Sequence, residues 1–270
     1  MVDKKTYDLL IIDDEQVIID AIARIAGGEG FTVDSSLSAI NALKQIENVN
    51  YKLIITDIMM PEMDGFQFLE ELEKRRISVP VILTTGFSTV EMAVKSLLKG
   101  AIGYIPKPFT AEEILSVIYR GMEYRRIEKE LKNNLFGKKN SSIIYVPCPP
   151  KYYRLGHNSW INIDNEGLVF VGATDLYLKT IKSLKKIELM KFEENIMQGS
   201  VCAKFETEES LIHHLLAPLS GMIVEPNYKL IDEPLLIEKD PYFRGWLYRI
   251  LPSNLEAELK NLSSCSSDRI

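Results

Sequence analysis

The sequence predicts an α/β domain and a mainly β domain, joined by a helical linker. The chain has 270 residues, a length that suits two domains, each able to bury its own core. Its first half alternates short apolar runs with amphipathic ones, whereas its second half consists of short β-like runs and turns. The change of pattern is the reason for expecting two different folds.

In the first half, five predicted strands alternate with five predicted helices. The runs LLII and LIIT are continuously apolar, which is typical of parallel strands buried on both faces of a sheet. An open parallel sheet with helices on both sides is therefore expected. The strands are residues 7–13, 31–36, 51–58, 80–85 and 103–108, and the helices are residues 16–27, 38–47, 66–76, 89–100 and 111–122.

Polar residues stand where these strands end. They are Asp13 and Asp14, Asp57, Thr84 and Thr85, and Lys107. The carboxyl ends of parallel strands share one edge of a sheet, so these side chains should meet there. Converging carboxylates repel one another unless a cation neutralises them, and ligand sets made only of oxygen atoms favour Mg²⁺. A nearby lysine and threonine hydroxyl could bind an added phosphoryl group.

This pattern resembles the receiver domain of bacterial two-component response regulators, a flavodoxin-like doubly wound fold, over residues 5–122. The resemblance rests on Asp13-Asp14-Glu15, Asp57 followed by MMPEMDG, Thr85-Gly86, Tyr104 and Lys107-Pro108. It implies that Asp57 accepts a phosphoryl group from the phosphohistidine of a sensor histidine kinase. It also implies that Asp14, Asp57 and the backbone carbonyl of Met59 hold Mg²⁺ directly, and Asp13 through water.

The resemblance further assigns switch and phosphoryl-binding roles to Thr85, Lys107 and Tyr104. Thr85 would move toward the phosphoryl oxygens and Tyr104 would swing in behind it, which changes the surface of the fourth helix, fifth strand and fifth helix. A buried tyrosine at a strand end is also ordinary core. Gly65 is expected to supply a positive φ in the loop after Asp57, and the Lys107-Pro108 bond resembles the family's cis bond.

The fifth helix is expected to continue into a linker, residues 123–142. Its interleaved charges favour a helix, but Gly121 and Glu128 interrupt the partial heptad pattern, so a stable coiled coil is not supported. Weak pairing into a homodimer, through this helix or the receiver, and a monomeric solvated helix both stay open. The run KKNSS, residues 138–142, indicates a domain boundary.

Residues 143–270 are expected to form a compact β barrel or sandwich with one or two helices. Predicted strands include SIIYVP, WINID and LVFVG, the last two joined by a turn at residues 165–167. A short helix should begin with Thr174 as its cap. Trp160, Trp246 and Tyr242 are candidate core anchors.

This second half resembles the glycine cleavage system H protein, a lipoyl-domain-like hybrid β barrel-sandwich. The segments that carry the resemblance are LGHNSWI, VGATD, APLSGMIVEPN and DPYFRGWLYRILPSNLEAEL. In register with the family's hairpin, the lipoylated lysine falls at Ser210, and Lys204 should lie in the strand. Serine has no amine for the amide bond to lipoate, so a degenerate lipoyl position without lipoate is expected.

The composition disfavours several other functions. A formal net charge of −6 offers no electrostatic surface for nucleic acid, and neither a membrane span nor a signal peptide is apparent, so a cytoplasmic protein is expected. The three cysteines lack metal-like spacing and should be reduced structural thiols. Neighbouring His213 and His214 should point to opposite faces of a strand, which prevents a shared metal.

The resulting hypothesis is a bacterial response regulator, not an enzyme, that signals through a non-lipoylated H protein-like domain acting as a protein-binding module. The alternative is an adaptor that docks on glycine cleavage or lipoate-handling enzymes. A transcription factor would need a helix-turn-helix and a basic face, and the second half has neither pattern. The sequence does not identify the kinase, the output partner, a small-molecule ligand, the oligomeric state or the direction of control.

Overall fold

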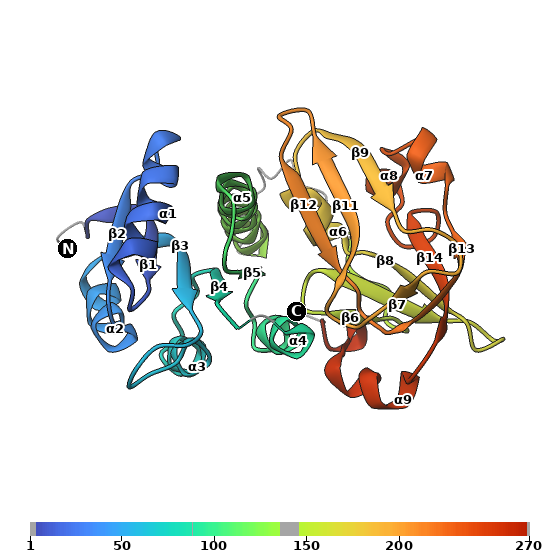
Figure 1. The fold of residues 1–270 in the computed structure, drawn as a ribbon, viewed down its shortest axis with the longest axis horizontal. Helices are drawn as coiled ribbons and strands as arrows, with labels where there is room; N and C mark the ends of the chain where they lie inside the picture. The colour runs from blue at the N-terminus through green and yellow to red at the C-terminus, as the bar shows by residue number, and fades with distance from the viewer. Residues whose placement is uncertain (1–3, 88, 136–145, 269–270) are drawn as a thin grey trace. The chain divides into compact units, whose positions relative to one another are not determined.

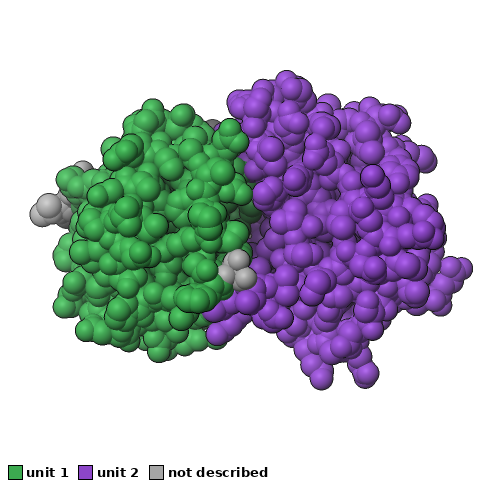
Figure 2. All heavy atoms as spheres, in the orientation of Figure 1, with its two compact units in different colours: residues 1–88, 99–140 green, residues 89–98, 141–270 purple. Residues whose placement is uncertain are grey.

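A computed structural model describes residues 4–87, 89–135 and 146–268 of the chain. Contacts divide the chain into two compact units, shown in different colours in Figure 2. The first unit comprises residues 1–88 and 99–140, and the second comprises residues 89–98 and 141–270. The run KKNSS, residues 138–142, and most of the predicted strand SIIYVP lie outside the described residues.

The first unit contains the predicted parallel sheet (Figure 1), with strand order β2-β1-β3-β4-β5. This order and the flanking helices are those of the flavodoxin-like doubly wound fold. Four consecutive residues of β1, Leu9–Ile12, are buried, as expected for a strand covered on both faces. The strands are β1 Thr6–Ile12, β2 Val33–Ser36, β3 Asn50–Asp57, β4 Val81–Thr85 and β5 Gly103–Pro106.

Helices cover both faces of this sheet. They are α1 Gln16–Gly28, α2 Ala39–Asn48, α3 Gly65–Lys74 and α5 Ala111–Leu135. Ile22 of α1 and Ile118 of α5 belong to one buried cluster with Leu53 and Ile82 of the sheet. Helices α2 and α3 contact each other on the other side of the sheet (Figure 1). The segments with apolar residues at helical spacing thus form helices that cover the two faces of the sheet.

Helix α5 confirms the predicted extension beyond residue 122 as one continuous helix. The Cβ position of Gly121 would lie 2.6 Å from the Leu53 side chain, so the glycine allows the helix to approach β3 closely. Beyond Gly121 along the helix, Ile127 is fully buried. The Arg125 guanidinium donates to the Ser78 carbonyl at 2.6 Å, and the Ser78 hydroxyl donates to Glu128 at 2.6 Å. The first turns of the linker therefore pack on the first unit and are not a solvated helix.

The second unit consists mainly of two antiparallel sheets (Figure 1), with orders β10-β13-β14-β8-β7-β6-β15 and β12-β11-β9. Two-sheet packing agrees with the mainly β prediction, although the described residues form four short helices after residue 146 where one or two were expected. The strands are β6 Tyr153–Leu155, β7 Ser159–Ile163, β8 Val169–Ala173, β9 Leu184–Leu189, β10 Asn195–Ile196, β11 Val201–Thr207, β12 Ile212–Leu216, β13 Gly221–Pro226, β14 Trp246–Pro252 and β15 Ser263–Ser264. The helices are α6 Asp175–Thr180, α7 Lys229–Asp232, α8 Leu236–Lys239 and α9 Leu255–Glu258, and 3₁₀ turns span Leu259–Asn261 and Cys265–Asp268.

Local signals in this unit were predicted correctly. Strands β7 and β8 pair as the expected hairpin, and Gly167 in its turn has φ +83°. The Thr174 hydroxyl accepts a hydrogen bond from the Tyr177 backbone at 3.2 Å, which caps α6 as predicted. Of the three proposed core anchors, Trp160 and Tyr242 are buried, whereas Trp246 is only partly buried.

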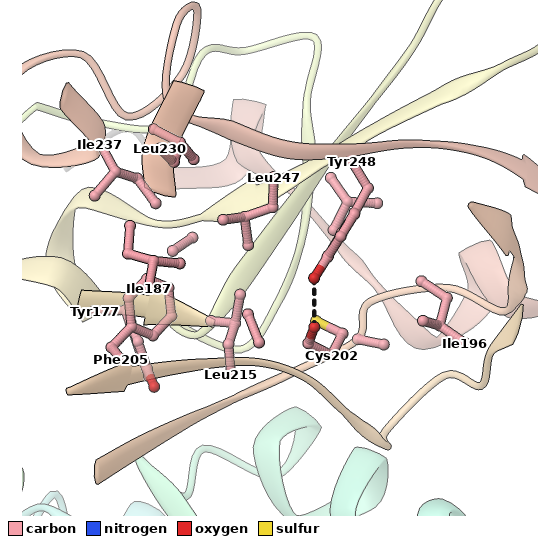
Figure 3. Close-up of a cluster of buried hydrophobic side chains, with 14 of the residues drawn as sticks. Tyr177, Ile187, Ile196, Cys202, Phe205, Leu215, Leu230, Ile237, Leu247 and Tyr248 are labelled. Carbon is pink, nitrogen blue, oxygen red and sulfur yellow. Dashed lines mark hydrogen bonds between the residues drawn. The ribbon is translucent and has the colours of Figure 1, made fainter. Parts of the chain in front are cut away.

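Buried side chains between the two sheets form the main core of the second unit (Figure 3). Phe205 and Leu215 from the smaller sheet belong to the same buried cluster as Leu247 and Tyr248 of β14. The Tyr248 hydroxyl donates to the Cys202 carbonyl at 2.6 Å, the bond drawn in Figure 3, and accepts from the Met190 backbone at 2.9 Å. Because its hydroxyl is paired, this tyrosine can be buried at little cost.

The second unit also includes α4, Val90–Leu98. Val94 and Leu97 of this helix form a buried cluster with Leu155 of β6, against which Leu216 and Leu262 pack. Gly199, with φ +86°, stands where a Cβ would lie 2.5 Å from the Val90 carbonyl oxygen. A larger residue at this position would force the helix away, so the glycine permits the close packing.

We expect the three cysteines to resist thiol reagents while the protein is folded. Cys148, Cys202 and Cys265 are buried and are not joined in disulfides, and burial raises the pKa of the Cys202 thiol to about 12. Since the thiolate is the reactive form, a chromogenic disulfide reagent at pH 8 should modify the native chain very slowly and all three thiols after unfolding in urea. Rapid modification of one thiol in the native chain would contradict this burial.

Candidate functional site

The carboxyl edge of the first sheet brings together most of the residues predicted from the strand ends. Asp13 directly follows β1, Asp57 ends β3, Thr85 ends β4, and Lys107 directly follows β5. Asp13 is 1% exposed, Asp57 is 3% exposed and Thr85 is fully buried. Adjacent parallel strands place these positions side by side because β1 pairs with β3, β3 with β4, and β4 with β5.

Lys107 connects the two buried carboxylates. Its Nζ donates to Asp13 Oδ2 at 2.7 Å and lies 2.8 Å from Asp57 Oδ1. The Lys107 backbone N–H donates to the Thr85 carbonyl at 2.7 Å, which anchors the lysine to the end of β4. The peptide bond from Lys107 to Pro108 is cis, as the sequence suggested. The lysine is thus held by its backbone and by its side chain.

The electrostatics keep this lysine charged. Burial alone would lower the pKa of Lys107, but the carboxylates of Asp13 and Asp57 outweigh that effect and raise the pKa above its usual value. Burial raises the pKa of Asp13, and the hydrogen bond from Lys107 opposes that rise only in part. The raised pKa favours the charged form of Lys107, which lies between two carboxyl groups and can stabilise further negative charge.

The two carboxylate oxygens of Asp57 have different partners. Its Oδ2 accepts a hydrogen bond from the Met59 backbone at 2.6 Å. Its Oδ1 approaches Lys107 as an ion pair, but the alignment is not that of a hydrogen bond, and among the described residues this buried oxygen has no hydrogen-bond partner. A buried carboxylate oxygen in this state is suited to take a cation or to form a bond.

The predicted magnesium ligands are only partly gathered. Asp13 and Asp57 share Lys107, whereas the Asp14 side chain is exposed. Within the described ranges, no three His, Cys, Asp or Glu side chains form a cluster able to hold a metal ion. The Asp57 Oδ1, which has no hydrogen-bond partner among the described residues, fits an oxygen-only site. The ligand set of Asp13, Asp14, Asp57 and the Met59 carbonyl stays a prediction.

Thr85 ends β4 and Tyr104 lies in β5, and their switch roles stay predictions. The Thr85 hydroxyl accepts a hydrogen bond from the Phe87 backbone at 3.2 Å. Tyr104 is half-buried on β5, aligned with Leu83 of β4. Thr84, which is aligned with Asp57, has a buried hydroxyl without a hydrogen-bond partner among the described residues. The Thr84 hydroxyl is therefore a second threonine hydroxyl, besides that of Thr85, near the end of the strand that carries Asp57.

The role predicted for Gly65 is wrong in its mechanism. Positive φ in the loop after Asp57 belongs to Glu62, at 63°, and Gly65 is not among the residues with positive φ. Instead, a Cβ on Gly65 would lie 2.5 Å from the Asp57 carbonyl oxygen. The glycine lets α3, capped by Asp64, begin directly against the strand that carries Asp57. Sequence alone could not separate a conformational from a steric need for glycine.

Gly65→Ala is expected to destabilise the first unit by about 1–3 kcal/mol, because the added methyl group must displace backbone atoms. Gly86→Ala is the matched control, since nothing lies within 4 Å of its Cβ position and its φ is not positive. Urea denaturation followed by far-ultraviolet circular dichroism checks the difference. Equal midpoints for the two variants would show that the contact with Asp57 is not rigid.

In the second unit, Ser210 lies in the turn between β11 and β12. It is exposed, has φ +63°, and its backbone N–H donates to the Thr207 carbonyl at 3.0 Å. Lys204 lies in β11, aligned with His214 and Glu188, as predicted. His213 is buried while His214 is half-buried, in line with opposite faces of one strand. The residue that the sequence register assigned to the lipoyl position thus lies in this turn and is a serine.

Family models identify the domains in both halves of the chain. Residues 9–119 match the family model of the response regulator receiver domain, and residues 151–268 match that of the glycine cleavage H-protein. The chain therefore joins a receiver domain of the response regulator family to a domain of the glycine cleavage H-protein family. Both resemblances drawn from the sequence are confirmed.

Two curated relatives and one solved structure are similar to parts of the chain. The "Probable transcriptional regulator ycf29" of Porphyra purpurea is 26% identical over 213 residues, covering 78% of this chain and 100% of the relative. The "Putative response regulator NtrX-like" of Rickettsia bellii is 35% identical over 136 residues, or 48% of this chain and 28% of the relative. A crystal structure of a glycine cleavage system H protein from Mycobacterium marinum is 32% identical, covers 39% of this chain and 87% of that chain, and has a TM-score of 0.37.

The chain spans under a third of the length of the NtrX-like relative that it matches. In the described part of the chain, every helix is too short or too polar to cross a bilayer.

Proposed function

We propose that the protein is a response regulator phosphorylated on Asp57 by a sensor histidine kinase. The observation that carries the proposal is the Asp57 carboxylate, buried at the end of β3 with one unbonded oxygen 2.8 Å from the Lys107 ammonium. In the reaction, an Asp57 oxygen attacks the phosphorus of a phosphohistidine. A P–O bond forms, the P–N bond breaks, and the imidazole leaves with the electron pair.

Lys107 supports this transfer with its charge. The ammonium group neutralises the oxygens of the transferred phosphoryl group, and its backbone attachment to Thr85 fixes its position. Mg²⁺, held by Asp14, Asp57 and the Met59 carbonyl, with Asp13 acting through water, would supply further neutralisation when bound. The oxygen-only donor set and the unbonded Asp57 Oδ1 support this assignment.

Phosphorylation would act on the second half through the switch residues. Thr85 is to exchange its hydrogen bond with Phe87 for one to a phosphoryl oxygen, and Tyr104 is to move in the same direction. Helix α4, which follows Thr85 closely in the sequence, packs in the second unit through Val94 and Leu97. These contacts support control of the second unit by the receiver.

The output in this proposal is protein binding, without enzymatic activity and without lipoate. Ser210 at the tip of the β11–β12 turn has no amine, which supports a carrier fold reused as a binding module. The proposed domain limits of the protein are residues 5–122 for the receiver, 123–142 for the linker and 143–270 for the output domain.

The proposal also includes a homodimer that forms through the receiver or the linker helix. Light scattering measures the molar mass of the protein in solution and so tests for this homodimer.

The match of residues 151–268 to the H-protein family favours one second candidate, an adaptor docked constitutively on glycine cleavage or lipoate-handling enzymes. Capture from lysate of the source organism distinguishes the two. The full chain with Mg²⁺ and beryllofluoride, a phosphoryl mimic, is compared with the untreated chain and with Asp57→Asn.

Partners enriched only by the beryllofluoride-treated wild type are the outcome expected of a response regulator. Equal capture of glycine cleavage or lipoylation enzymes by all three samples would favour the adaptor and would overturn the proposed output.

A further inference from the structure

The second unit contains a surface cavity of about 300 Å³ that neither the phosphorylation site nor the β11–β12 turn uses. Its walls come from the end of β13, the starts of α7 and α8, and the loop that leads into β14. A cavity of this size can hold a single ring or a short acyl chain, near the lower limit of ordinary ligand sites. Its chemistry indicates which kind of ligand fits.

The walls of the cavity are held in place before any ligand binds. The buried Asn227 side chain donates to the backbone carbonyls of Arg244, at 3.0 Å, and Trp246, at 2.7 Å. Gly245 donates to the Asp240 carbonyl at 2.8 Å, and a Cβ at Gly245 would lie 2.7 Å from that oxygen. The loop is thus fastened to the neighbouring turn, and binding requires little further ordering.

Aromatic side chains line the opening. Phe243 is 72% exposed and Tyr228 is 51% exposed, although both are large and apolar. Trp246 is partly buried and packs edge to face on Phe170, with ring centroids 5.5 Å apart. Exposed aromatic groups gathered at a concave surface are typical of a binding site, whereas scattered ones carry no such meaning.

Two cations stand at the same opening. Lys229 and Arg244 line the cavity, and in the part of the chain that is described neither side chain makes an ion pair or hydrogen bond. Glu225 is the only carboxylate lining the cavity in that part, and its Oε2 lies 3.3 Å from Arg249 Nη1. The charges at the cavity that have no partner are therefore positive, although the net charge of the whole chain is −6.

We propose that this cavity binds an organic carboxylate with an apolar body. The carboxylate would pair with Lys229 and Arg244, and the body would lie against Phe243, Tyr228 and Trp246. The proposal does not depend on phosphorylation of Asp57. The apolar body of the ligand can be either an acyl chain or a single ring, and the experiment distinguishes these two kinds of ligand.

The test titrates the full-length protein by calorimetry with octanoate and phenylacetate, each against its neutral amide. Saturable binding of at least one carboxylate is expected, with the amide at least about tenfold weaker, because the charge-assisted hydrogen bonds are lost. Higher salt should weaken binding of the carboxylate. The preferred probe shows whether the site takes a chain or a ring.

Variants locate the binding on the protein. Lys229→Gln and Arg244→Gln should each weaken carboxylate binding about tenfold, and Phe243→Ser should weaken carboxylate and amide alike. Lys191→Gln and Phe192→Ser are the matched controls, since both residues are exposed and neither lines the cavity. All of these side chains are at the surface, so the variants should fold.

Three results would overturn the proposal. They are equal affinity for carboxylate and amide, no saturable binding of either carboxylate at millimolar concentration, and equal effects of the cavity and control variants.

Discussion

Asp57→Asn should abolish phosphoryl labelling of the protein by a small phosphodonor such as acetyl phosphate. The substitution keeps the size of the side chain and an oxygen for the Met59 N–H, but removes the carboxylate nucleophile next to Lys107. We expect a loss of more than about a hundredfold in incorporated phosphoryl groups, comparable to removal of a covalent nucleophile. Intact mass spectrometry of the treated chain measures the added mass directly.

The control for this result is Asp20→Asn. Asp20 is exposed on α1 and accepts a hydrogen bond from Gln16, away from the strand ends. Its labelling should equal that of the unmodified chain. If Asp57→Asn were still labelled at the normal rate, another residue would be the acceptor and the assignment of Asp57 would be wrong.

Trp160→Ala is expected to lower the free energy of unfolding of the second unit by about 3–5 kcal/mol, the range found when a large buried aromatic side chain is deleted. The Trp160 ring is almost completely buried and packs on Tyr152 and Tyr242, with centroids 5.0 and 5.9 Å away. Its indole N–H also donates to the Ala173 carbonyl at 2.9 Å, which would lose this partner.

Urea denaturation followed by tryptophan fluorescence measures the loss, because Trp246 remains in the variant and both tryptophans belong to the second unit. Phe192→Ala is the control, since Phe192 is exposed and a surface substitution should change stability by less than about 0.5 kcal/mol. A loss below about 1 kcal/mol for Trp160→Ala would mean that the surrounding rings collapse into the space.

Much of the receiver site could be predicted because its parts follow a local rule. Asp13, Asp57, Thr85 and Lys107 stand at strand ends, and a parallel sheet brings strand ends to one edge whatever the details of packing. The same reasoning placed Asp14 with the others, but its side chain is exposed and outside the contacts of Lys107. Proximity along the chain does not fix the direction of a side chain.

The sequence patterns did not predict contacts between segments that are far apart in the sequence. Gly121 looked like an interruption of a heptad, yet it lets α5 pack against Leu53. The sequence left the linker helix open between weak pairing and a solvated monomeric helix, whereas in the structure Ser78 binds Arg125 and Glu128. In each case the partner lies more than forty residues away. Helical periodicity reports which face is apolar and not which element covers it.

The sequence patterns by themselves predicted the two fold classes, the alternation of strands and helices in the first half and the polar residues at the strand ends, because periodicity, turn residues and residue chemistry are local. The roles expected of Asp57 as phosphoacceptor and of Ser210 at the lipoyl position came from the resemblance to known families and stay predictions. The tertiary structure decided how Lys107 is shared between two buried carboxylates and why Gly65 must be glycine. It alone also placed Lys229 and Phe243 at one cavity, because side chains remote in sequence meet only when the chain is packed.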